Sequence, residues 1–370
     1  MNTVSAEKTY ELSAEESKTI TYYKGILCLM VVMIHAYCLD SHFKDENFTV
    51  TPPAWIKYLI TLNSHVICQC AVPAFFVISA FLLYRKPFRW QCNLRKKMRT
   101  LGIPYVLVNT FWLMFYFILQ HIPRLSGLFS DPNKLLSNWN WTDYLNAYLG
   151  FKTTQMVYPP YWFIRDLIVL NILGGGIKWL IDRFPRLIAV LLVAGMIFGI
   201  NTHVFFLNYS SVFWFSIGYY IVKFDWHFER FIDTRTRKIL LVLIYIVTIN
   251  LALFTMESAA GKALMFAANF CGILVWYLLV YSLLSFFNRR KAFRVISHYN
   301  FMIYSFHALL LSLCLKVWTV AFKPTTGIGI FAEYFVVPAI IVSCCIAVSY
   351  FVERYLPVLY RLLNGQLAKK

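Results

Sequence analysis

The sequence predicts an all-α polytopic integral membrane protein with about ten transmembrane helices and both termini in the cytoplasm. Three observations support this fold class. Hydrophobic residues make up 59% of the 370 residues and charged residues only 14%, against about 25% charged residues in soluble globular chains. Apolar stretches long enough to cross a bilayer recur along the chain. Basic residues gather in alternate connections between these stretches.

Ten apolar segments are the candidate crossings. The sixth is the weakest, because SSVFWFSIGYYIVK is short for a full crossing and depends on tilt or local thinning of the bilayer. The predicted crossings are residues 24–42, 64–84, 101–120, 161–180, 187–205, 210–223, 239–256, 264–287, 299–321 and 328–351.

The distribution of basic residues agrees with this count. With the N-terminus inside, 26 of the 35 Lys and Arg residues fall on the cytoplasmic side and eight on the outer side. This bias is what the positive-inside rule predicts for ten helices with cytoplasmic termini. The net charge of +18 is therefore attributed to membrane topology and not to binding of nucleic acid.

Three regions follow from this arrangement: a polar cytoplasmic segment (1–20), the transmembrane domain (21–353) and a basic cytoplasmic tail (354–370). The first twenty residues lack the basic start, apolar centre and cleavage site of a secretory signal, so the first crossing is expected to be retained. The nine cysteines show neither a disulfide framework nor zinc-ligand spacing and are expected to be small buried apolar residues. No metal is expected, and no nucleotide-hydrolysis motif is present.

The first crossing, KGILCLMVVMIHAYCLD, carries the strongest candidate residues. At about 1.5 Å and 100° per residue, Lys24 and His35 lie roughly 16 Å apart and within about 20° of one helix face. His35 would then lie near mid-depth in the bilayer, where an ionisable side chain is costly and is a functional candidate. The alternative is an interhelical hydrogen bond without a chemical role.

Other ionisable residues within the crossings are Arg165, Asp166, His307, Lys316 and Glu333. Arg165 and Asp166 are consecutive, so they should point about 100° apart and each should find a partner elsewhere. An interhelical ion pair is the structural alternative to a functional Arg165. His307 should lie near the depth of His35, and packing is its preferred interpretation.

Two connections are unusual. Residues 85–100, RKPFRWQCNLRKKMRT, hold seven bases and no acid, which indicates either contact with anionic lipid or an anion-binding platform. The outer segment 121–160 contains NWNWTDYLNAYLGF, which is typical of short amphipathic helices at the membrane surface.

Several stretches resemble motifs of the membrane acyltransferase 3 family. Lys24, ten residues and His35 are similar to its Arg-x10-His signature, and FFVISAFLLYR (75–85) to its FF-x-x-SGFL-x-x-R motif. RTLGIPY (99–105), YWFIRDLIVL (161–170) and NFMIYSFHALLL (300–311) resemble further motifs in the same order. Two positions depart from the pattern: Lys24 replaces the usual Arg and so loses its bidentate fork, and Ala80 replaces a Gly at a tight position.

This resemblance implies transfer of an acetyl or other short acyl group from cytoplasmic acyl-CoA, most simply acetyl-CoA, to a hydroxyl of a cell-envelope carbohydrate. The enzyme would reside in the cell membrane. His35 is the candidate general base, because burial favours the neutral, proton-accepting imidazole. Lys24 and Arg85, with Ser79 and Arg99 from the matching motifs, are the candidates for donor binding.

Arg165 is the candidate for orienting the acceptor or a developing oxyanion. Three alternatives stay open at this point. A covalent acyl-histidine could replace general-base catalysis. The chain could export polysaccharide without acyl transfer, or it could be a structural scaffold.

Overall fold

The computed structural model describes residues 10–39, 52–122, 135–151, 156–198, 207–227, 234–322 and 326–366. Within these ranges the regular structure is helical apart from a single bridge residue at Leu207, so the all-α prediction is confirmed. The longer helices are α1 (Ala14–His35), α3 (Ala54–Leu62), α4 (Ala71–Tyr84), α5 (Trp90–Lys97), α6 (Ile103–His121), α8 (Trp141–Leu149), α9 (Trp162–Arg183), α10 (Pro185–Ile197), α11 (Tyr209–Lys223), α13 (Arg235–Phe254), α14 (Ala259–Ser282), α16 (Lys291–Phe322) and α17 (Gly327–Tyr355). Two short helices are α15 (Leu284–Arg289) and α18 (Pro357–Leu363), and two π-helices, η1 (Asn63–Ile67) and η3 (Met98–Gly102), interrupt longer runs.

Seven helical runs in the described residues are long and apolar enough to cross a membrane, which makes the chain a polytopic membrane protein. Each of the ten predicted crossings contains a helix. The three that fall outside the seven correspond to α9, which is 22 residues long but carries Arg165, Asp166 and Lys178, and to α10 and α11, with 13 and 15 residues. Ten crossings and cytoplasmic termini therefore stay predictions.

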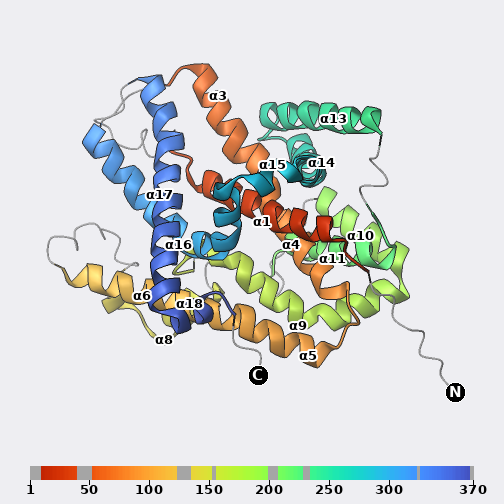
Figure 1. Ribbon diagram of the computed structural model, residues 1–370, viewed down its shortest axis with the longest axis horizontal. Coiled ribbons are helices and arrows are strands. Elements are labelled where there is room, and N and C mark those ends of the chain that lie inside the picture. Colours follow the sequence, from red (N-terminus) through yellow and green to blue (C-terminus); the bar gives the residue numbers. More distant parts are fainter. Residues whose placement is uncertain are drawn as a thin grey trace. The chain divides into compact units, whose positions relative to one another are not determined.

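The described residues divide into two compact units, drawn from 1–88, 176–201 and 209–350 in the first and from 89–175, 202–208 and 351–370 in the second. In the first unit α1 packs against α4, α14 and α16 (Figure 1). It begins ten residues before the predicted crossing, because Ser13 and Glu16 form a capping box at its N-terminus. The helix ends at His35.

Helices α1 and α16 run side by side in the same direction. Ser297 lies against Gly25, the Cys28 thiol donates to the Asn300 carbonyl at 3.2 Å, and His307 faces His35. Moving the same number of residues along both helices therefore leads from one contacting pair to the next. This register sets the two histidines at the same level.

Helices α4 and α11 of the first unit approach each other closely at a glycine. A Cβ added to Gly218 would lie 2.4 Å from the Val77 carbonyl oxygen and 2.6 Å from Cβ of Ala80. Ala80 is fully buried, so the methyl group at this tight position of the motif is accommodated by the missing side chain of Gly218.

We expect Gly218→Ala to lower the free energy of unfolding by about 1–3 kcal/mol, because backbone atoms of α4 must move apart. Gly176→Ala is the matched control, since a Cβ there meets no atom within 4 Å. Thermal unfolding in detergent measures both variants. Equal melting temperatures for the two would contradict the proposed close approach.

An ion-pair cluster joins the end of α9 to the end of α11. Asp182 accepts hydrogen bonds from Lys178 at 2.8 Å and from Lys223 and Tyr219 at 2.6 Å each. Burial acts to raise the pKa of Asp182, but these three hydrogen bonds outweigh it and the pKa is lowered.

A carboxyl whose pKa is lowered by folding stabilises the folded state above its unfolded pKa, and this stabilisation is lost as the pH falls through the folded pKa. We therefore expect Asp182→Asn to lower the melting temperature at neutral pH, with the difference from the native chain shrinking below about pH 4. The exposed carboxylate of Glu257 supplies the control variant Glu257→Gln. A difference that stays constant down to pH 3 would exclude this linkage.

In the second unit aromatic residues form the packed centre. Trp112 of α6 stacks on Tyr158 with ring centroids 5.4 Å apart, and Tyr105 stacks on Tyr161 at 5.8 Å. The predicted surface helix within 121–160 is present as α8, which begins at the side-chain cap of Asn140 and ends at Gly150 with φ of 65°. Trp141 is 73% exposed, as an interfacial aromatic residue requires.

The cysteines follow the prediction in part. All nine are free thiols. Five are buried, whereas Cys92 and Cys344 are exposed on helices. Cys344 lies on a face of α17 that also carries the exposed Ile340 and Val348.

Candidate active site

His35 is the last residue of α1, and its side chain is exposed at the end of the helix. The position is set by the backbone: the Ala36 N–H donates to the Met33 carbonyl, which ends the helix at this point. Because His35 is open on one side and packed against α16 on the other, a substrate hydroxyl can reach its ring. This is the access that a general base needs.

His307 of α16 lies beside His35, with ring centroids 5.3 Å apart. His307 is fully buried, and its Nδ1 lies 2.9 Å from the Tyr304 carbonyl and 3.1 Å from the Ile303 carbonyl. Carbonyl oxygens only accept, so Nδ1 carries the proton and donates, and Nε2 keeps its lone pair. Within the described residues Nε2 has no hydrogen-bond partner. The backbone therefore fixes the tautomer and leaves a buried basic nitrogen unused by the fold.

Two polar residues of η1, Asn63 and Ser64, form hydrogen bonds near the end of α1. The Ser64 hydroxyl donates to the Met33 carbonyl at 2.7 Å and also contacts the Tyr334 hydroxyl at 2.7 Å. Asn63 Nδ2 donates to the same tyrosine oxygen at 2.8 Å. A π-turn inserted in a long helix commonly marks a functional position. Here it turns polar side chains toward the helix end that carries His35.

Lys24 lies on the same helix as His35, eleven residues earlier, which is about 16 Å along the axis. Its side chain is half-buried, and no carboxylate of the described chain forms a salt bridge with it. Such a lysine can attract a donor anion toward the helix.

Ser79 and Arg85 occupy the middle and the end of α4. Arg85 caps the helix, is half-buried, and its carbonyl accepts the Tyr10 N–H at 2.9 Å. Ser79 is half-buried. Both belong to the first unit, together with Lys24 and His35.

The second unit holds the other two predicted residues, Arg99 and Arg165. Arg99 is exposed on η3. The basic stretch that precedes it is not a loop, because residues 90–97 form helix α5, and Trp90 Nε1 donates to the Ile172 carbonyl at 2.9 Å. Arg95 and Lys96 of this helix are exposed, and Lys97 is half-buried.

The expectation that Arg165 and Asp166 do not face each other is wrong. Arg165 donates from Nε and Nη2 to Asp166 Oδ1 at 3.1 and 2.8 Å, and from Nη1 to the Leu149 carbonyl at 2.9 Å. The arginine side chain is long enough to reach the carboxylate of the next residue, so the 100° between the two Cβ directions does not separate the charges. The Asn208 N–H donates to the second carboxylate oxygen at 3.3 Å. Arg165 thus has one neutralising partner and unused N–H groups.

Three residues at the histidine site were not expected from the sequence. His307 was interpreted mainly as a packing residue, and Asn63 and Ser64 were taken as the edge of a crossing that began at residue 64. The helical run in fact covers Ala54–Tyr84, which places these polar residues inside it. The signal was present as NSH, three successive polar residues within an apolar stretch.

The acyltransferase domain model matches residues 18–353. The chain belongs to the acyltransferase 3 family. It is also 27% identical over 155 residues to the succinoglycan biosynthesis protein ExoH of Rhizobium meliloti (strain 1021), a match that covers 41% of this chain and 40% of that protein. No solved structure matches the chain. This acyltransferase is a membrane protein whose family uses an acyl donor.

Proposed function

We propose that the protein is an O-acyltransferase that moves an acetyl or other short acyl group from acyl-CoA to a hydroxyl of a cell-envelope carbohydrate. The observation that carries this proposal is the histidine pair: an exposed His35 beside a buried His307 whose Nε2 has no hydrogen-bond partner among the described residues. Two neutral imidazoles at an accessible helix end suit removal of a proton from a hydroxyl.

In this proposal His35 accepts the proton of the acceptor hydroxyl while the hydroxyl oxygen attacks the thioester carbonyl carbon. A new C–O bond forms, the C–S bond breaks, and the CoA thiolate leaves and takes the proton from His35. His307 accepts a hydrogen bond at Nε2 from the protonated His35 ring, which stabilises the His35 imidazolium during transfer. We propose direct transfer of the acyl group, without an acyl-histidine intermediate, because the Nε2 lone pair of His307 beside His35 supports base catalysis.

The donor is proposed to be acetyl-CoA, held from the cytoplasmic side by positive charge. Lys24 lies on the helix of His35, and Arg85 and Ser79 belong to the neighbouring α4. Arg99 lies at the end of an exposed basic helix that can attract phosphate groups. Arg165 is proposed to orient the acceptor through the N–H groups not used by Asp166.

The similarity to ExoH, a succinoglycan biosynthesis protein, supports an envelope polysaccharide as acceptor. The membrane is accordingly proposed to be the cell membrane, with ten crossings and cytoplasmic termini that bring the basic surfaces to the donor.

The test is transfer of label from radioactive acetyl-CoA, with other short acyl-CoAs in parallel, to envelope glycan in membranes that contain the native chain or His35→Ala. We expect label in glycan with the native chain and none with the variant at equal protein abundance. Absence of transfer from every donor, together with glycan accumulating on the inner side when the protein is deleted, would favour export in place of acyl transfer.

A further inference from the structure

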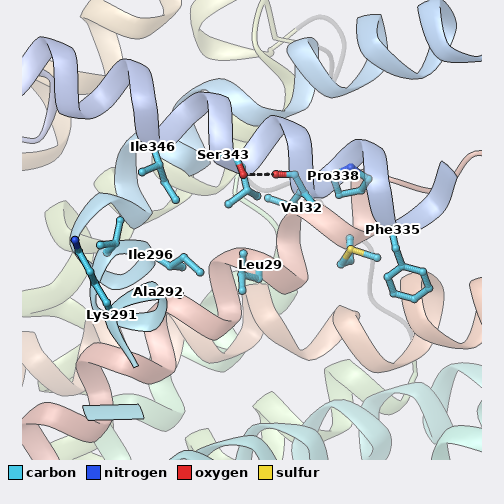
Figure 2. Close-up of a pocket in the computed structure, with 13 residues that line it drawn as sticks. Leu29, Val32, Lys291, Ala292, Ile296, Phe335, Pro338, Ser343 and Ile346 are labelled. Carbon is cyan, nitrogen blue, oxygen red and sulfur yellow. Dashed lines mark hydrogen bonds between the residues drawn. The ribbon is translucent and has the colours of Figure 1, made fainter. Parts of the chain in front are cut away.

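A groove with a volume of 670 Å³ lies between α1, α16 and α17 of the first unit. Leu29 and Met33 line it from α1, Lys291 and Ile296 from α16, and Pro338 from α17. Figure 2 shows Lys291 at one end of the groove and Phe335 at the other. The volume lies within the range of about 300–1,000 Å³ found for ligand pockets.

The chemistry of the lining is that of a site for an apolar chain. Its residues are aliphatic or aromatic except for Lys291 and Ser343. The Ser343 hydroxyl donates to the Ala339 carbonyl at 2.8 Å, so its one proton is used within the helix. Small side chains such as Ala292 and Ala339 leave the space that bulkier residues would fill. Beyond Lys291 the lining therefore offers nothing for a charged or sugar-like ligand.

The charged end of the groove is strongly basic. Lys291 begins α16 and is exposed, and Arg289, Arg290 and Arg294 surround it in sequence and are exposed as well. No Asp or Glu occurs between residues 284 and 300. Clusters of this kind at a membrane surface attract anionic lipid headgroups. An occupant with one anionic end and one long apolar end satisfies both parts of the groove.

The distance of the basic end from the histidine pair indicates that the groove does not bind the acyl donor or the acceptor. Sixteen residues separate Lys291 from His307 on one helix, which is about 24 Å along its axis. An anion held at Lys291 would lie far from the histidine pair, whereas the apolar end of the groove reaches Met33, two residues before His35. The groove thus suits a bound lipid more than an acyl donor or acceptor.

We propose that this groove binds an anionic phospholipid, with one acyl chain along α1, α16 and α17 and the phosphate at Lys291. The bound chain packs against Met33, whose carbonyl also holds Ser64 and the end of α1. The lipid therefore helps to hold the helix end that carries His35. This inference concerns lipid binding itself and does not depend on the proposed acyl transfer.

The test uses the full chain purified in detergent and native mass spectrometry with phosphatidylglycerol or phosphatidylcholine of the same acyl chains. We expect the native chain to retain phosphatidylglycerol in preference to phosphatidylcholine. Lys291→Gln should weaken phosphatidylglycerol binding about fivefold, the effect of one basic residue near a membrane surface. Ala339→Phe should remove binding of both lipids by filling the groove.

Three further variants keep the result interpretable. Ser343→Phe fills the groove from a second exposed position, one turn further along α17, and therefore provides an independent test if Ala339→Phe does not fold. Val348→Phe adds similar bulk at a 59% exposed position of the same helix outside the lining, and Lys238→Gln removes a basic residue of α13. Both controls should bind lipid as the native chain does.

Native-like binding in Ser343→Phe and in every folded groove-filling variant would overturn the proposal. Equal retention of the two lipids by the native chain would overturn it too, since the phosphate at Lys291 would then select nothing. Equal losses in Lys291→Gln and Lys238→Gln would attribute binding to overall charge and exclude this site.

Discussion

Replacement of His307 by Ala is expected to reduce acyl transfer nearly as much as replacement of His35, by about 10²- to 10⁴-fold in turnover. The reason is that the two rings lie 5.3 Å apart and Nε2 of His307 is free to accept a hydrogen bond from the reacting groups. Turnover of labelled acetyl-CoA in membranes, normalised to protein abundance, measures both variants.

A double-variant cycle distinguishes a joint role from two independent ones. If the histidines act as a unit, the variant lacking both should be no slower than His35→Ala, because effects within a catalytic unit are not additive. His298→Ala removes an exposed histidine from the same helix and should keep native turnover. Full activity of His307→Ala would return His307 to the packing role favoured by the sequence.

Replacement of Asp166 by Asn is expected to lower the free energy of unfolding by about 3–5 kcal/mol, because it leaves the Arg165 guanidinium buried without its counter-charge. Arg165 is 7% exposed and Asp166 fully buried, and their closest atoms lie 2.8 Å apart. Thermal unfolding of the purified chain measures the loss.

The paired replacement Arg165→Met with Asp166→Leu is the matched control, because removing both charges avoids an unpaired one. We expect this variant to recover most of the native melting temperature and to lose acyl transfer. A stable and active double variant would limit Arg165 to a structural ion pair. A double variant as unstable as Asp166→Asn would mean that packing, not charge, explains the loss.

The family and the helical architecture could be predicted from the sequence because both depend on local features. Long apolar stretches require helices in a bilayer, since every backbone polar group must be satisfied internally. Motifs such as FFVISAFLLYR and YWFIRDLIVL are contiguous, so they could be identified before any contact was known. Helix boundaries were less well predicted: the capping box of Ser13 and Glu16 extends α1 by ten residues.

The candidate site could be predicted only in part. His35 stood out as an ionisable residue in an apolar helix, a property of the sequence alone. The pairing with His307 depends on the register between α1 and α16, two helices more than 250 residues apart in the chain. The 100° between consecutive helical residues did not predict the Arg165–Asp166 ion pair, because a flexible side chain can reach a partner that its Cβ does not face.

Hydrophobicity, charge distribution and motif order thus determined by themselves that this chain is an all-α membrane protein of the acyltransferase 3 family, with His35 as the leading candidate base. Only the tertiary structure placed His307 beside it, accommodated Ala80 against Gly218, and formed the groove that ends at Lys291. The physical reason is the separation along the chain of the residues that must interact. Membrane partition depends on the composition of each segment, whereas a proton-transfer pair or a lipid groove depends on side chains from separate helices, whose relative register no single segment encodes.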